Sequence, residues 1–90
     1  SKLITLIYFE EAIVVFTEKR IGSLIYDEGS GRMDIRFGLE EYHGGLHCGD
    51  GMEVMLDGKW VPTRIEMNIN SKWYLVGVDT DSLIGLAVRV

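Results

Sequence analysis

Hydrophobic and polar positions alternate along most of the chain from residue 21 onward, which is the pattern of a β-strand with one buried face. The clearest case is the run 32–37, in which Met33, Ile35 and Phe37 alternate with charged residues. The predicted strands are 21–27, 32–37, 52–56, 59–67, 72–78 and 83–90. Glycine, aspartate and asparagine separate them, and these residues favour tight turns. The pattern therefore predicts a series of antiparallel hairpins.

Two short turns predict the register of the last hairpins, because a two-residue loop fixes which residues face each other. A turn at 57–58 places Met55 opposite Trp60, and a turn at 70–71 places Met67 opposite Tyr74. Cross-strand partners share a face. The predicted core face carries Met52, Val54, Leu56, Val61, Ile65, Met67, Tyr74 and Val76. The predicted outer face carries Met55, Trp60, Pro62, Arg64, Glu66, Trp73 and Leu75.

A meander of five or six strands tends to curl, because closure removes the open strand edges. We therefore predict an all-β fold, in which residues 21–90 form a small SH3-like barrel within a single domain, 1–90. Residues 1–20 are more apolar, and the runs 3–9 and 12–17 are typical of strands that are buried on both faces, with a helix as the alternative. We expect this segment to pack on the barrel, or residues 3–17 to join two copies of the chain.

Composition narrows the environment and the partners. The formal net charge is −5, which disfavours phosphate backbones and anionic membranes as ligands. A single cysteine, Cys48, cannot form an internal disulfide, so a reducing cytoplasmic location is expected. Glu10 and Glu11 interrupt the longest apolar region, which is therefore not a membrane-spanning helix.

The predicted outer face is the first candidate binding site. It brings together Trp60, Trp73, Arg64 and Met55, and tryptophan and arginine are enriched where binding energy concentrates. The same tryptophans, with Arg64 and Lys72, could stack single-stranded bases, which makes a nucleic-acid-binding barrel the alternative function. A purely structural interpretation is that the apolar residues 3–17 cover this face.

A glycine-rich loop, residues 38–51, starts a region without lysine or arginine that extends to residue 58. The acidic candidates in this region are Glu40, Glu41, Asp50 and Glu53. Together they would make one edge of the domain negative, which suits a basic partner. The alternative is a loop that only improves solubility.

The same loop contains His43, His47 and Cys48, which are potential metal ligands or, for the thiol, a potential nucleophile. Their spacing matches no established zinc pattern, and Gly44-Gly45 disfavours a helical pairing of the histidines. The chain also lacks a recognisable third group to orient a catalytic base. We therefore expect no metal, no cofactor and no enzymatic activity.

One set of residues between Tyr26 and Gly77 forms a familiar pattern: Tyr26, Asp27, Ser30–Arg32, Asp34–Phe37, Gly44–Gly49, Gly58, Trp60–Glu66 and Trp73–Gly77. On these residues, the region 21–90 resembles a small family of domains of unknown function from Gram-positive bacteria, often encoded on conjugative or other mobile elements. Residues 1–20 depart from it. The resemblance implies a bacterial cytoplasmic accessory protein and assigns no site. Together with the residues above, it predicts a non-enzymatic module that binds another macromolecule, with a protein as the expected partner.

Overall fold

The computed structural model describes residues 4–9, 12–17 and 19–90, and side chains from Lys19 onward. The strands are β1 (Ile4–Phe9), β2 (Ala12–Thr17), β3 (Ile21–Asp27), β4 (Arg32–Arg36), β5 (Gly51–Leu56), β6 (Lys59–Met67), β7 (Trp73–Leu75) and β8 (Ala87–Arg89). The described residues form no helix, and accordingly none that is long and apolar enough to cross a membrane. The all-β prediction is confirmed.

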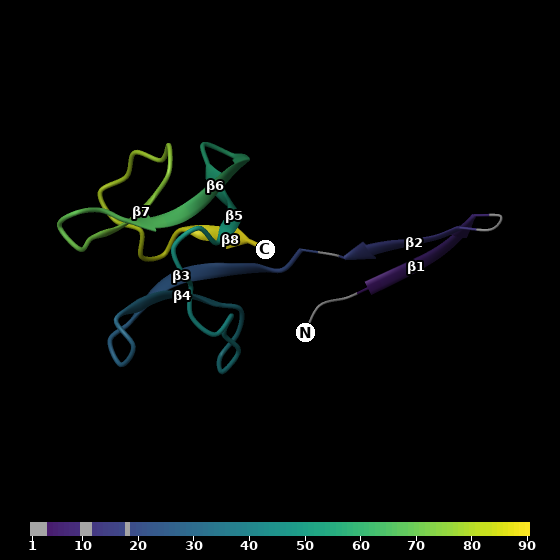
Figure 1. Cartoon of the computed structure of the whole chain (residues 1–90), viewed down its shortest axis with the longest axis horizontal. Coiled ribbons are helices and arrows are strands. Elements are labelled where there is room, and N and C mark those ends of the chain that lie inside the picture. Colours follow the sequence, from purple (N-terminus) through teal and green to yellow (C-terminus); the bar gives the residue numbers. More distant parts are fainter. Residues whose placement is uncertain (1–3, 10–11, 18) are drawn as a thin grey trace.

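Strands β3 to β8 form one antiparallel sheet in the order β4-β3-β8-β5-β6-β7 (Figure 1). The short strand β8 lies in the middle and pairs with β3 on one side and β5 on the other. The end strands β4 and β7 are not paired with each other, so the predicted closure into a barrel is not confirmed. The two ends of the sheet are linked by a side-chain bond, since the Trp73 indole Nε1 donates to the carbonyl of Gly31, just before β4, at 3.1 Å.

The core lies on one face of this sheet. Three directly opposed pairs are fully buried: Leu24 with Ile35, Val54 with Val88, and Ile65 with Leu75. The other buried hydrophobic residues from Lys19 onward are Met33, Leu46 and Met52. Met52, Val54 and Ile65 therefore confirm part of the predicted core, and Leu46 joins it from the long loop.

The predicted turn between β5 and β6 is confirmed. Asp57 and Gly58 have φ values of 50° and 77°, as a type I′ turn requires at both central residues. Met55 pairs with Trp60, and Val54 pairs with Val61, as the sequence predicts.

The predicted turn between β6 and β7 is wrong by one residue. The loop has three residues, 69–71, because the Ser71 amide donates to the Asn68 carbonyl at 3.0 Å and Ser71 has a φ of 60°. This combination is a turn followed by a left-handed residue. The Asn68 side chain stabilises it by accepting bonds from the amides of Asn70 and Lys72.

The extra loop residue exchanges the two faces of β7, because side chains alternate along a strand. Trp73, and not Tyr74, is opposite Met67, and Leu75 is opposite Ile65. Leu75 is buried and Trp73 packs against the core, whereas Tyr74 is exposed. The predicted assignment of these residues to faces is therefore reversed.

Residues 4–9 and 12–17 form a separate antiparallel pair of strands, in which Ile4 pairs with Thr17 and Phe9 with Ala12. This confirms strands over a helix. The hairpin shares no strand pairing with the six-stranded sheet and extends away from it (Figure 1). Its side chains lie outside the described residues, so its predicted roles in covering the sheet or joining two copies stay predictions.

Candidate functional site

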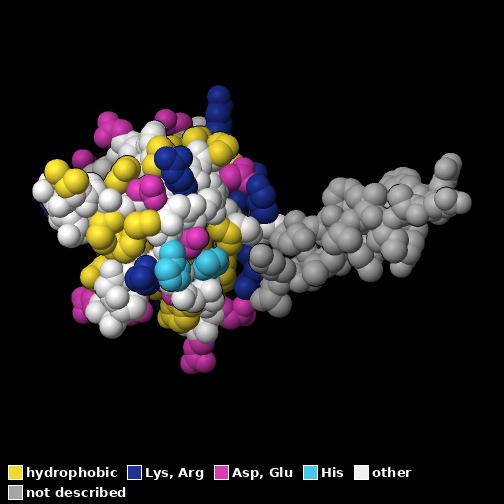
Figure 2. Space-filling model, in the orientation of Figure 1, with side chains coloured by type: hydrophobic (Ala, Val, Ile, Leu, Met, Phe, Trp, Pro, Cys, Tyr) yellow, Lys and Arg dark blue, Asp and Glu magenta, His cyan; other side chains and the backbone are white. Residues whose placement is uncertain are grey.

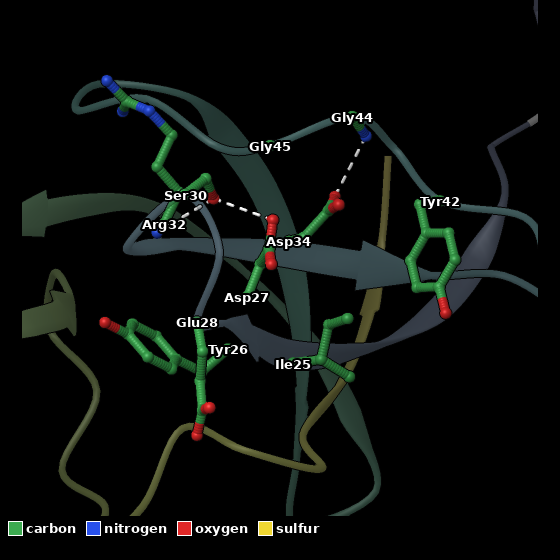
Figure 3. A pocket seen from close by; sticks show the side chains of 10 residues that line it. All are labelled: Ile25, Tyr26, Asp27, Glu28, Ser30, Arg32, Asp34, Tyr42, Gly44 and Gly45. Atoms are coloured by element: carbon green, nitrogen blue, oxygen red, sulfur yellow. Dashed lines mark hydrogen bonds between the residues drawn. The ribbon is translucent and has the colours of Figure 1, made fainter.

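A cavity of about 480 Å³ opens between the β3–β4 hairpin and the chain segment 42–45 (Figure 3). We call it the tyrosine pocket, because Tyr26 and Tyr42 lie on either side of it. Its lining consists of Ile25, Tyr26, Asp27, Glu28, Ser30, Arg32, Asp34, Tyr42, Gly44 and Gly45.

The segment 42–46 forms one wall because it runs along the free edge of β4. The His43 amide donates to the Ile35 carbonyl at 2.9 Å, and the Leu46 amide donates to the Met33 carbonyl at 2.8 Å. The Leu46 side chain is buried, which anchors the segment in the core. The wall is therefore fixed by backbone bonds and by one apolar side chain.

Gly44 and Gly45 allow this wall to lie close to β4. Their φ values are 109° and 98°, a region that residues with a Cβ rarely adopt. The Gly44 amide donates to Asp34 Oδ1 at 3.0 Å, so the loop backbone is bonded directly to a β4 side chain. The paired glycines thus allow the segment to follow the edge of β4.

Asp34 lies at the floor of the pocket and is 7% exposed, the one buried charged residue in the described part of the chain. Its Oδ1 accepts two bonds, from the Ile35 amide at 2.7 Å and from the Gly44 amide. No described group donates to Oδ2. Every fully enclosed side-chain oxygen or nitrogen in the described part has a partner, so Oδ2 is not fully enclosed.

The rim of the pocket is polar and aromatic. Tyr26 and Tyr42 are 46% and 49% exposed. Asp27 holds the β3–β4 turn, since it accepts bonds from the Gly29 amide at 3.0 Å and the Ser30 hydroxyl at 2.8 Å. The rim is therefore built on a turn that is stabilised by its own side chains.

Charge in the lining is predominantly negative, with the carboxylates of Asp27, Glu28 and Asp34 against the guanidinium of Arg32. Arg32 donates through Nη1 to the Leu46 carbonyl at 3.2 Å, which attaches it to the loop. The lining contains no thiol or histidine, and its single hydroxyl apart from the tyrosines, Ser30, is bonded to Asp27. This arrangement can bind a polar or cationic group.

The predicted tryptophan face is not assembled. Trp60 lies on the outer face of β6 opposite Met55, whereas Trp73 lies on the core side of β7. Arg64 is exposed on β6, and its Nε lies 3.8 Å from Glu66 Oε2. The structure therefore brings together Met55 and Trp60 but separates Trp73 from them.

Trp60 is half-buried and one face of its ring is occupied. The Arg89 guanidinium lies 4.6 Å from the ring centroid. Arg89 also donates two bonds to Glu53, at 3.0 and 3.2 Å, and Lys19 pairs with the same carboxylate. These bonds from Arg89 and Lys19 lower the pKa of Glu53 to about 2. The cluster consists of charges that already have partners.

The predicted acidic edge is also largely paired. Arg20 donates to Glu41 at 2.6 Å, and this bond lowers the pKa of the Glu41 carboxyl. Asp50 accepts a bond from the His47 amide at 2.8 Å and so closes the loop turn. Glu40 is exposed, and Glu53 belongs to the Arg89 cluster described above. These carboxylates do not form one continuous unpaired surface.

The two histidines lie on one face of the molecule (Figure 2). His43, His47 and Cys48 are all exposed. His47 Nδ1 lies 4.0 Å from Asp50 Oδ2. Within residues whose positions are described, no group of three or more histidine, cysteine, aspartate or glutamate side chains is placed to hold a metal ion.

The tyrosine pocket was not predicted from the sequence, because the strand pattern places Asp34 on the solvent face of a half-buried strand. The strand alternation is correct, but segment 42–46 covers that face. The adjacent glycines 44–45 were the available signal, since glycine often marks a place where another backbone approaches closely.

Comparison with known proteins identifies the fold and the family. A crystal structure of a protein from Ruminococcus gnavus is similar to this chain, with 52% sequence identity and a TM-score of 0.73. The similarity covers 79% of this chain and the whole of the other. No protein of curated function matches. Residues 22–90 match the domain of unknown function DUF5348, so the chain belongs to this family.

Proposed function

We propose that this domain is a non-enzymatic protein-interaction module and that the tyrosine pocket is its docking site. The observation that carries the proposal is the pocket itself, a cavity of about 480 Å³ with Tyr26 and Tyr42 on its rim and a buried carboxylate at its floor. Small-molecule and side-chain sites typically combine such a cavity with aromatic walls and a few placed polar groups. Tyrosine is also among the residues enriched where partners bind.

The size of the cavity suits one or two side chains of an extended segment better than a folded surface. It opens at an edge of the sheet, between a hairpin turn and a loop, so a chain can reach it from outside. The rim tyrosines offer large contact areas with few rotatable bonds, which keeps the entropic cost of binding low. A protein segment that inserts a side chain is therefore the ligand that fits these features.

A nucleic-acid partner is less suited to this surface. The pocket lining has three carboxylates against one arginine, and the chain has a net charge of −5. Phosphate groups are bound by clusters of lysine and arginine. With Trp60 and Trp73 on different faces, the tryptophan platform that motivated this alternative is absent from the described surface. The bacterial mobile-element context and cytoplasmic location implied by the family resemblance stay part of this proposal.

The proposal can be tested by selecting peptides from a phage-displayed random library on the immobilised full chain. Enriched peptides are then synthesised and titrated by isothermal calorimetry against the wild type, Tyr26→Ala, Tyr42→Ala and Tyr74→Ala. Tyr74 is the matched control, because it is 41% exposed on β7 and does not line the pocket.

We expect each pocket variant to weaken binding by about tenfold or more, and Tyr74→Ala to leave it unchanged. Losses of more than 1 kcal/mol on truncation to alanine mark the residues that dominate binding. A selection that yields no binding peptide, or peptides that bind equally well to the two pocket variants, would show that the pocket is not the docking site.

A further inference from the structure

We infer that the side chain taken up by the tyrosine pocket is cationic, an arginine or lysine of the partner segment. This inference rests on the proposed function and adds the chemistry of the ligand. Asp34 lines the pocket and is buried, with Oδ1 bonded to two backbone amides and Oδ2 without a hydrogen-bond donor among the described residues. Figure 3 shows this carboxylate directed toward Gly44, with the tyrosines on either side.

A buried carboxylate requires either hydrogen-bond donors or a compensating charge. The amides of Ile35 and Gly44 supply two of the donors that the Asp34 carboxylate needs, both to Oδ1. A ligand that fills the cavity would remove water from Oδ2. A neutral apolar side chain would leave that oxygen without a partner, and an anionic one would add repulsion at short range. A cationic side chain provides both a donor and an opposite charge, which gives a charge-assisted hydrogen bond.

The surroundings of Asp34 favour the same choice. Glu28 and Asp27 add negative charge at the rim, and the one positive group of the lining, Arg32, is attached to the Leu46 carbonyl. The Asp27 carboxylate already accepts bonds from the Gly29 amide and the Ser30 hydroxyl of its own turn. It therefore contributes negative charge to the pocket rather than a free hydrogen-bond acceptor. The lining therefore has an excess of negative charge that its own arginine does not cancel.

Tyr42 adds an aromatic contact on the side of Asp34. It pairs with Arg36, so it lies on the face of β4 that carries Asp34, whereas Tyr26 is opposite Met33 on the other face, at the hairpin end of the pocket. Aromatic ring faces are negative and attract a guanidinium or ammonium group that lies over them. A cation that reaches Asp34 would pass the Tyr42 ring, so an aromatic ring and a carboxylate would act on the same end of the incoming side chain.

The test uses ¹⁵N-labelled full chain and three capped peptides of the form acetyl-Gly-X-Gly-amide, in which X is arginine, lysine or citrulline. Citrulline has nearly the shape of arginine but no charge. We expect the arginine and lysine peptides to shift the amide resonances of Gly44, Gly45 and Ile35 in a saturable way. The citrulline peptide should bind at least tenfold more weakly, as expected when a charge-assisted hydrogen bond is lost.

Two pocket variants and one control variant test the residue assignment. Asp34→Asn keeps an oxygen that can accept the amides of Ile35 and Gly44 but removes the charge, so we expect it to fold and to lose at least tenfold in affinity for the arginine peptide. Glu28→Gln, at the exposed rim, should lose about two- to threefold, and Tyr74→Ala should lose nothing. If Asp34→Asn fails to fold, the Glu28→Gln titration and the comparison of arginine with citrulline still decide the matter.

Equal shifts for the arginine and citrulline peptides would overturn the inference, as would the absence of saturable shifts at the pocket for all three peptides. These results are distinct from failure of the proposed function. Library peptides that require Tyr26 and Tyr42 but contain no arginine or lysine would leave the docking site in place and refute only the cationic ligand.

Discussion

Gly22 provides a sharp test of how closely β3 packs against its neighbours. A Cβ built at this position would lie 2.5 Å from Ile35 Cγ2, 2.7 Å from the Arg36 carbonyl oxygen and 2.8 Å from Phe37 Cδ1. Ile35 is fully buried and the carbonyl belongs to the backbone, so neither can move away easily. Overpacking of a core typically costs about 1–3 kcal/mol. Two of the three obstacles are rigid, so we expect Gly22→Ala to lose about 2–3 kcal/mol.

A loss of this size should lower the Tm by roughly 10–20 °C, because 1 kcal/mol corresponds to about 4–8 °C in a domain of 60–100 residues. The assay is thermal unfolding followed by circular dichroism, with urea unfolding as a second measurement. Gly51→Ala is the matched control, because Gly51 is also in a strand and a Cβ there would approach only the Thr63 carbonyl, at 3.9 Å. Equal melting of the two variants would refute the close approach of β3 to Ile35 and Phe37.

Three further predictions concern other parts of the molecule. The Glu53 carboxyl should titrate near pH 2 when followed by NMR, and Arg89→Gln should move this midpoint toward the ordinary pKa of 4.5. Because the pKa is lower in the folded state, the pairing stabilises the fold above pH 4.5, and this stabilisation is lost as the pH falls toward 2. Trp73→Phe should cost about 1 kcal/mol in urea unfolding, because it removes the indole bond to Gly31 while it keeps an aromatic ring, and an unchanged midpoint would contradict this. A chain of residues 20–90 should keep a cooperative melt within a few degrees of the full chain, because the β1–β2 hairpin shares no strand pairing with the sheet, and loss of cooperativity would show that the hairpin supports it.

The two tight hairpins show where prediction from the sequence succeeded and where it failed. Asp57-Gly58 is a dipeptide whose conformational preference selects one turn type, so the β5–β6 register followed directly. The sequence 68–72 contains several residues that tolerate turns, and the choice depended on the Asn68 side chain, which bonds two later amides. A local sequence pattern does not distinguish a two-residue loop from a three-residue loop in this case. The error of one residue then moved Trp73 from the core to the predicted binding face.

The candidate site was less accessible to prediction for a different reason. Strand periodicity correctly places Asp34 opposite to Met33 and Ile35, but it does not show which segment lies above it. That depends on the loop 38–50 pairing with the edge of β4, a contact between backbones that leaves little trace in side-chain pattern. In the same way, the sequence shows that residues 38–58 carry only acidic charges. It does not show that Glu41 pairs with Arg20, or Glu53 with Lys19 and Arg89, because these partners are distant in the sequence.

The central position of β8 has a consequence for how the chain reaches its folded state. The β3–β4 and β5–β6 hairpins are local, and such units form in about 1–10 μs. Strand β8 joins them into one sheet, and Ile21 pairs with Arg89 across nearly the whole length of the domain. Pairings this distant in sequence form late and slow the overall rate. During synthesis, at about 5–20 residues per second, both hairpins would wait on the order of seconds with their core faces open to water until β8 emerges.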